Sequence, residues 1–173
     1  AVAEAASPPP PGPLLGEPLY DRRVRSPRHT KLHVAPFAEL DARTFHDLLR
    51  LRIDVFVVEQ ACAYPELDGR DAEPGTLHLW LDHDGVPVAY LRILDDGTAA
   101  RIGRVVVARW ARGRGLARQM LTEALAVIGS RPCVLDAQSY LVDFYAGFGF
   151  VPTGPEFIED GIPHVPMRRD PTD

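Results

Sequence analysis

Three apolar segments separated by short turn signals constrain the fold of this chain more than any other feature. Residues 77–81, 88–93 and 99–107 are rich in the β-branched, aliphatic and aromatic side chains that favour strands. Asp84-Gly85 and Asp96-Gly97 lie between them, and an Asp-Gly pair readily adopts the backbone conformation of a tight hairpin turn. The three segments therefore predict an antiparallel meander.

Apolar residues at helical spacing predict helices on either side of this meander. One helix follows Asp41, a residue type that often caps helix N-termini. The clearest helix covers residues 116–128, where apolar and polar side chains occupy opposite faces, and Gly129 suits the position just after its last turn. A second helix after it carries Tyr145 and closes at Gly149.

The remaining elements are short strands and loops. Residues 30–34, 133–137 and 164–169 are predicted strands, whereas residues 61–75 and 159–163 are rich in glycine, proline and acidic residues and are predicted loops. A meander that leads into a strand–loop–helix–strand–helix unit forms a mixed sheet. We therefore predict an α/β (α+β) fold with a mixed, mostly antiparallel central sheet and helices on both faces.

The length and charge of the chain favour one folded domain. Its 173 residues suffice for a sizeable core, and we place this domain at residues 31–173. Residues 1–30 are rich in proline, which favours extended backbone, so we predict a flexible N-terminal segment there. The net charge of −5 indicates no general affinity for nucleic acid, and the arginines of residues 22–28 are most simply a solvated basic patch.

The sequence also bears on where in the cell the protein resides and on whether it binds a metal ion. No apolar run approaches the roughly 20 residues that span a bilayer, and the N-terminus lacks the basic region of a signal peptide. Cys62 and Cys133 have neither a disulfide framework nor a zinc spacing. His78, His83 and Asp84 likewise lack a metal-binding spacing. We therefore predict a cytoplasmic protein that binds neither a membrane nor a metal.

The transition from strand to helix between Val107 and Leu116 predicts an anion site. The first N–H groups of a helix have no internal partner, and the helix dipole favours negative charge there. Gly113 and Gly115 let an anion approach the backbone. The loop lacks the Gly-Lys-Ser/Thr of a Walker motif and, with Arg118, the third glycine of a dinucleotide fingerprint. Taken alone, it could also be a tight turn with surface arginines.

The sequence around this loop resembles the GNAT superfamily of N-acetyltransferases. The family's acetyl-CoA signature, Arg/Gln-x-x-Gly-x-Gly/Ala, is matched by Arg112, Gly115 and Ala117. Residues 143–150 resemble its second signature, a helix ending in Tyr-x-x-x-Gly-Phe. Resemblance to the ElaA-type branch of the family is seen in four further runs, at residues 51–60, 64–69, 138–140 and 159–164. Together the likeness covers about residues 40 to 167.

This resemblance implies a role for each part of the loop and of its neighbours. The preceding strand and the strand that starts near Cys133 are implied to splay apart so that acetyl-CoA, the co-substrate, enters between them. Gln138 stands where the family often has an Asn that contacts the cofactor arm. The implied contacts to the pyrophosphate come from the backbone of Arg112, Gly113, Arg114, Gly115, Leu116 and Ala117, and those to the pantetheine arm from Val105 and Val107.

The implied reaction moves an acetyl group from acetyl-CoA to a primary amine by direct attack. Tyr145 occupies the position of the family's acid, and a neutral phenol can protonate the leaving thiolate. The base is open: Glu59 and His164 are the main candidates, while Glu66, Glu159, Asp160 or a water chain are alternatives.

The sequence leaves the acceptor, the oligomeric state and the presence of turnover open. The acceptor is a small molecule or a peptide amine that the sequence does not name, and a homodimer is equally open. The alternative function is a CoA-binding regulatory or interaction module without turnover.

Overall fold

One open sheet organises the part of the chain that the computed structural model describes, residues 30–171. Its strand order is β1-β2-β3-β4-β5-β8-β6, and β7 also pairs with β8. All neighbours are antiparallel except β4 and β5, which confirms the predicted mixed, mostly antiparallel sheet. The strands are β1 (Lys31–Pro36), β2 (Leu77–His83), β3 (Val86–Asp95), β4 (Ala100–Val107), β5 (Cys133–Gln138), β6 (Val151–Pro152), β7 (Phe157–Glu159) and β8 (Ile162–Arg169).

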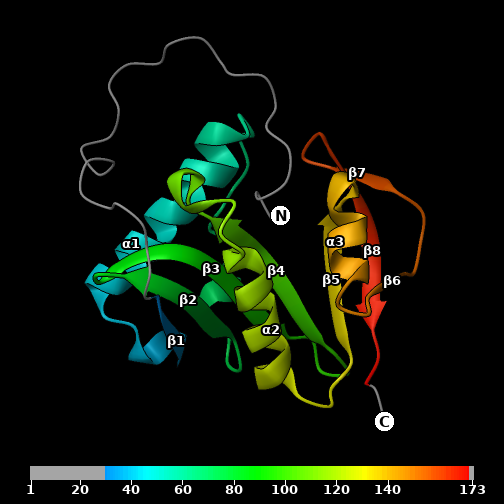
Figure 1. The fold of residues 1–173 in the computed structure, drawn as a ribbon, viewed down its shortest axis with the longest axis horizontal. Coiled ribbons are helices and arrows are strands. Elements are labelled where there is room, and N and C mark those ends of the chain that lie inside the picture. The colour runs from blue at the N-terminus through cyan, green and yellow to red at the C-terminus, as the bar shows by residue number, and fades with distance from the viewer. Residues whose placement is uncertain (1–29, 172–173) are drawn as a thin grey trace.

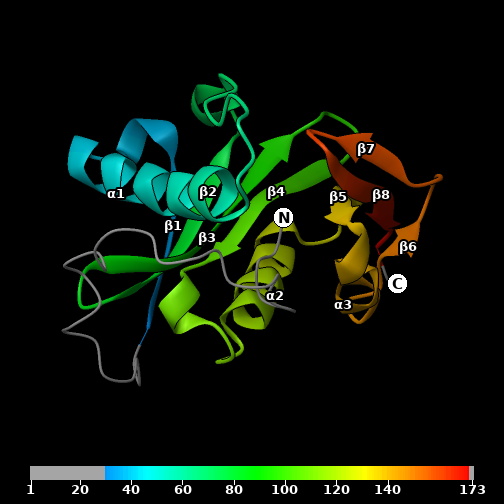
Figure 2. The same ribbon diagram turned by 90° about the horizontal axis from the view of Figure 1, so that it is seen from above.

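Helices cover both faces of the sheet, as predicted. α1 (Ala42–Ile53) lies on one face of β1–β4, and α2 (Leu116–Ile128) lies on the other (Figure 2). α3 (Val142–Ala146) packs near β5 and β8 and is shorter than predicted, because a 3-10 turn precedes it. α1 continues into a π-helical turn, η2 (Asp54–Glu59), and the 3-10 turns are η1 (Phe37–Glu39), η3 (Arg70–Ala72), η4 (Arg109–Ala111) and η5 (Ser139–Leu141).

Asp-Gly pairs form two hairpin turns. Asp84 and Gly85 have φ of 53° and 78°, as a turn with two left-handed residues requires. Asp160 and Gly161 have φ of 50° and 78° and join β7 to β8. The predicted loop at residues 159–163 is therefore wrong in extent, because strand pairing leaves only these two residues in the turn. The short strands β6 and β7 were not predicted.

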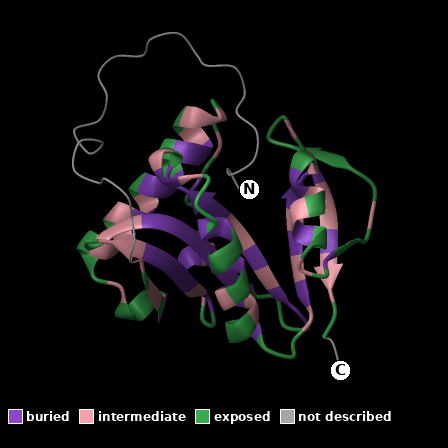
Figure 3. Ribbon diagram, viewed as in Figure 1, coloured by how far each residue is buried: buried purple, intermediate pink, exposed green. Residues whose placement is uncertain are grey.

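The core lies between the sheet and the two longer helices. β3 is buried at every position from Val88 to Leu94, because α1 and α2 cover its two faces. Figure 3 shows this buried band running through β2, β3 and β4. From α2, the side chains of Met120 and Leu121 are fully buried against it. Among residues 30–171, no helix is long and apolar enough to cross a membrane.

The sheet divides between β4 and β5. Only Ala100 and Arg101 of β4 pair with β5, although β4 continues to Val107. Figure 1 shows the two strands close together at one end and diverging toward the other. A β-bulge at Arg104, with φ of 56°, shifts the register between β3 and β4, and a bulge bends its strand and increases its twist. The predicted splay of the central strands is therefore confirmed.

A buried ion network fixes the segment at residues 61–75 against the sheet. Arg52 of α1 is fully buried and donates to the carboxylates of Glu66 and Asp71. Arg92 of β3 donates to Asp71, at 2.9 Å, and to Asp68, at 2.6 and 2.9 Å. Because each of these acidic residues has an arginine partner, a segment without long secondary structure is held in one position.

Candidate functional site

The glycine loop lies between the end of β4 and the start of α2. Gly113 and Gly115 have φ of 73° and 75°, which favours glycine. A Cβ atom at either position would meet no heavy atom within 4 Å. The backbone conformation, and not crowding by the protein, therefore explains both glycines, and space in front of the loop is left for a ligand.

The N-terminus of α2 presents free N–H groups beside this loop. The N–H of Gln119 donates to the carbonyl of Gly115, at 3.0 Å, as the first helical hydrogen bond. The N–H groups of Leu116, Ala117 and Arg118 have no backbone partner among residues 30–171. The side chains of Leu116 and Ala117 are buried and anchor this turn in the core. Such a cluster of N–H groups at a helix start binds phosphate.

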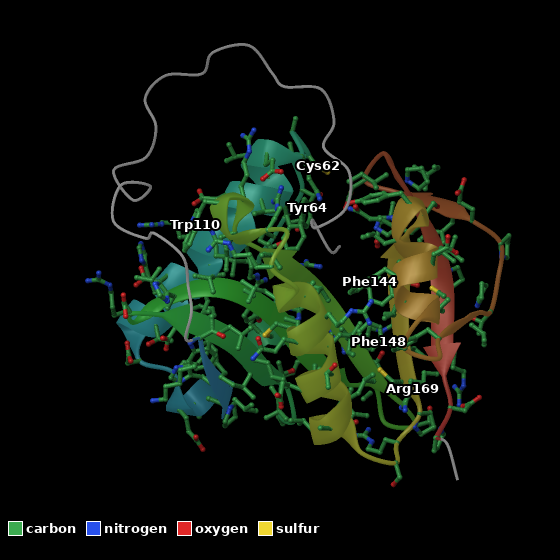
Figure 4. All side chains as sticks on the ribbon, in the orientation of Figure 1. Cys62, Tyr64, Trp110, Phe144, Phe148 and Arg169 are labelled. Atoms are coloured by element: carbon green, nitrogen blue, oxygen red, sulfur yellow. The ribbon has the colours of Figure 1, made fainter. Side chains whose placement is uncertain are left out.

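The three arginines of this region lie differently. Arg112 is paired with Glu59: its two terminal nitrogens donate to the two carboxylate oxygens, at 2.6 and 2.9 Å. Arg114 is exposed at the tip of the loop. The guanidinium of Arg118 stacks over the rings of Phe144 and Phe148, with its carbon 5.9 and 5.2 Å from the ring centroids. Figure 4 shows both rings between α2 and β5. Arg118 therefore connects the two arms into which the sheet divides, a larger arm of β1–β4 and a smaller arm of β5–β8.

The end of β4 directs toward β5 backbone groups that pair with no other strand, although the carbonyl of Val107 accepts a hydrogen bond from the side chain of Arg112, at 3.2 Å. The N–H of Ala108 donates to the carbonyl of Val88, at 2.9 Å, so the backbone groups of Ala108 face β3. Because successive residues of a strand alternate, the N–H and C=O of Val107 face the opposite edge, and those of Val105 face it as well. β5 does not pair there. The two valines therefore lie where an extended ligand arm can add to the sheet.

Gln138 and His164 are neighbours on the other arm. Gln138 ends β5, pairs in register with His164 of β8, and is buried. Its amide nitrogen lies 3.5 Å from the side-chain oxygen of Gln60. His164 is buried too, and its Nδ1 lies 2.9 Å from the carbonyl of Ile162 while its ring stacks on Phe157. Nε2 is therefore the nitrogen of His164 left for another partner.

Tyr145 lies in α3 on the same arm. Its side chain is 2% exposed and its ring contacts those of Phe144 and Phe150 edge-on. Burial raises the pKa of Tyr145 far above that of free tyrosine, and Tyr140 raises it further. The phenol is therefore neutral throughout the physiological range and retains a proton that it can donate. Its hydroxyl group has no hydrogen-bond partner among residues 30–171.

The run from Tyr145 to Phe150 forms a Schellman motif. The N–H of Phe150 donates to the carbonyl of Tyr145, at 3.3 Å, and the N–H of Gly149 donates to that of Ala146, at 2.9 Å. Gly149 has the left-handed φ of 85° that this motif requires, and the rings of Phe150 and Tyr145 make its usual apolar contact. From β8, Arg169 donates to the carbonyl of Phe148, at 3.1 Å (Figure 4). The Tyr-x-x-x-Gly-Phe pattern thus fixes where Tyr145 lies.

Replacing Gly149 with alanine should lower the free energy of unfolding by about 1–2 kcal/mol, the cost of a left-handed L-residue. The new methyl group meets only the flexible side chain of Arg169, at 3.7 Å or more, so strain in φ is the main cause. Gly103→Ala is the matched control, since Gly103 has ordinary φ and open space around it. Chemical denaturation of both variants measures the difference, and equal stability of the two would contradict the motif's role.

The candidate bases are in different surroundings. Both carboxylate oxygens of Glu59 accept from Arg112, and Glu66 is held by Arg52, Tyr64 and Arg104. Glu159 and Asp160 are exposed at the β7–β8 turn. Among the described residues no group of acids, histidines and cysteines could hold a metal ion.

The segment at residues 59–62 brings several of these parts together. Glu59 contacts the glycine loop, Gln60 contacts β5, and the thiol of Cys62 donates to the carbonyl of Asp160 in the β7–β8 turn, at 3.3 Å. Sequence reasoning did not single out Gln60 or Arg118, because both contacts join segments that are distant in the chain. The ElaA-like run at residues 51–60 and the prediction of Glu59 as a candidate base pointed to this segment.

Comparison with known proteins agrees with this geometry. A model of the acetyltransferase (GNAT) domain matches residues 46–171. A UPF0039 protein of Mycobacterium tuberculosis is 52% identical over 136 residues, which cover 76% of this chain and 87% of that protein. Protein ElaA of Escherichia coli is 39% identical over 140 residues, covering 77% of this chain and 92% of ElaA.

Solved structures give the same result. The crystal structure of ElaA from Escherichia coli matches with a TM-score of 0.78 and 36% identity, covering 82% of this chain and 100% of that one. An acyl-CoA N-acyltransferase from Pseudomonas aeruginosa matches with a TM-score of 0.79 and 40% identity, covering 82% of this chain and 99% of that one. With both signatures matched and the splayed sheet in place, the chain belongs to the GNAT family of acetyltransferases and is a relative of ElaA.

Proposed function

We propose that this protein is an N-acetyltransferase that moves an acetyl group from acetyl-CoA to a primary amine. The observation that carries the proposal is the set of free N–H groups at the start of α2, next to the unpaired edge of β4. The first feature suits a pyrophosphate and the second suits the amide-containing pantetheine arm. Together they match the two ends of a coenzyme A molecule.

The chemistry follows from the residues around the splay. The amine nitrogen attacks the thioester carbon, and the resulting oxyanion needs hydrogen-bond donors. The N–H of Val107 faces this gap and can supply one. When the C–S bond breaks, the thiolate takes a proton from the phenol of Tyr145. The proton of the amine passes to a base, for which we propose His164 Nε2 or a water molecule, because both carboxylate oxygens of Glu59 already accept from Arg112.

The acidic residues near this region give no reason to expect a cationic acceptor. Glu59, Glu66 and Asp68 are already paired with arginine: Glu59 with Arg112, Glu66 with Arg52, and Asp68 with Arg92 and Arg104. Burial alone would raise the pKa of Asp68, but the hydrogen bond and charge of Arg92, with the charge of Arg104, hold it well below the usual range. The acceptor's amine is therefore the only part of the substrate that the proposal specifies.

Calorimetry with acetyl-CoA and with CoA tests the proposal. We expect both to bind, and we expect thiol release when a panel of small amines and peptides is added. Absence of binding by either would overturn the proposal. Binding without thiol release from any amine would instead favour the regulatory module without turnover.

A further inference from the structure

Each nitrogen of the Arg112 guanidinium already donates a hydrogen bond within the protein. Besides its two hydrogen bonds to Glu59, its Nε donates to the carbonyl of Val107, at 3.2 Å. A guanidinium has five N–H groups in a fixed fork, and this one is directed at the end of β4 and at η2.

The π-helical turn explains why Glu59 reaches Arg112. The N–H of Gln60 donates to the carbonyl of Val55, at 3.0 Å, five residues earlier. This wider turn changes the direction in which residues 59 and 60 project, and Ala61 then leaves it with φ of 51°. Such turns recur at functional sites because they redirect side chains without breaking the helix. Here the turn points Glu59 at one arm and Gln60 at the other.

The Glu59–Arg112 pair also lies close to the second arm. Burial raises the pKa of Tyr140, the charge of Arg112 lowers it and that of Glu59 raises it. The pair therefore acts electrostatically on η5, the turn that follows β5. Gln60 and Cys62 contact Gln138 and Asp160 on the same arm. Residues 59–62 therefore connect the end of β4, the end of β5 and the β7–β8 turn.

We propose that Arg112 and Glu59 are positioning residues that hold the end of β4 and the segment at residues 59–62 in the reactive arrangement. Arg112 then is not a phosphate ligand through its side chain, and Glu59 is not the base. The phosphate charge is met by the loop amides and by exposed Arg114. The inference rests on the proposed acetyl transfer, because the arrangement it preserves is that of Val107 facing the thioester.

The expected effect is on turnover more than on binding. An ion pair that solvent still reaches contributes modestly to stability; the side chains here are 21% and 24% exposed. Displacement of a reacting group by about 1 Å, in contrast, can lower the rate by about 10²-fold. Glu59→Gln and Arg112→Gln should therefore each lower kcat by about 10- to 100-fold while leaving the Kd for CoA nearly unchanged. Because both break one pair, the double variant should be no slower than the slower single variant.

Three measurements separate this proposal from the simpler roles. If Arg112 bound phosphate, Arg112→Gln would weaken CoA binding by roughly tenfold or more and Glu59→Gln would not. If Glu59 were the base, Glu59→Gln would remove the acidic limb of the pH–rate profile, whereas a positioning role leaves that limb in place. Arg114→Gln should weaken CoA binding, in contrast to Arg112→Gln. Either of the first two results would overturn the proposal.

Hydrogen exchange provides a test that needs no acceptor. We expect faster amide exchange in residues 54–62 and in residues 105–112 in both variants, since either change separates the two segments. Arg131→Gln, which breaks the exposed pair with Asp95, is the matched control and should leave both segments unchanged. Faster exchange confined to the substituted segment would contradict the coupling. Failure of the wild-type protein to bind CoA would instead count against the proposed function.

Discussion

Replacing Tyr145 with phenylalanine is expected to lower kcat by about 10²- to 10⁴-fold, the usual contribution of a positioned acid. The variant keeps the ring contacts with Phe144 and Phe150 and loses no hydrogen bond to residues 30–171. Thermal unfolding and CoA binding should therefore remain as in the wild-type protein. The measurement is steady-state thiol release with the best amine of the panel.

The pH dependence gives this prediction a second part. Because the pKa of Tyr145 is raised far above neutrality, the phenol stays protonated as pH increases through the physiological range. Ionisation of Tyr145 should therefore cause no fall of the wild-type rate there. A variant with unchanged kcat at every pH would exclude Tyr145 as the acid.

Replacing Arg52 with methionine is expected to lower the free energy of unfolding by about 3–5 kcal/mol. Methionine keeps the apolar stem of the side chain but removes its charge. The carboxylates of Glu66, Asp68 and Asp71 then have only Arg92 and Arg104 as arginine partners, so one negative charge of the buried network is uncompensated, which is costly. Urea denaturation measures the loss. Arg43→Met is the matched control on the same helix, since Arg43 pairs with Asp47 at the surface, where such pairs contribute little.

The loss should depend on pH in a defined direction. Burial alone would raise the pKa of Asp71, but the hydrogen bonds and charges of Arg52 and Arg92 lower it. A carboxyl group with a lowered folded-state pKa stabilises the protein above its unfolded pKa, about 3.9. That stabilisation is lost as the pH falls through the pKa that the carboxyl group has in the folded protein. The difference between wild type and Arg52→Met should thus shrink below about pH 4, and a loss that is small or independent of pH would contradict this account.

Local chemistry made much of the fold predictable. Asp84-Gly85 determines its turn through two backbone conformations that depend only on those residues, and the helix at residues 116–128 is recognisable by its apolar face. Asp160-Gly161 carries the same signal, but three-residue β7 was too short to be recognised as a strand. The splay of β4 and β5 came from the family resemblance, because no local pattern determines where a parallel pair stops.

The candidate site was predictable only in part. Free N–H groups follow from a loop that leads into a helix, so Gly113 and Gly115 could be recognised locally. The pairing of Arg112 with Glu59 joins residues 53 positions apart, and nothing in either segment indicates it. Arg52 likewise occurs among apolar residues of α1, and its burial depends on acids that arrive from residues 66 and 71.

The division of the sheet has a consequence for the order in which the protein is made. β1 to β4, α1 and α2 come from residues 31–128, whereas β5, α3 and β8 come from residues 133–169. The larger arm can bury its core before the ribosome has added the smaller one, as N-terminal units generally do. Tyr145 belongs to the late arm and Val107 to the early arm. We therefore expect a nascent chain to have a folded body before it has all the residues of the proposed site, because Tyr145 is added after Val107.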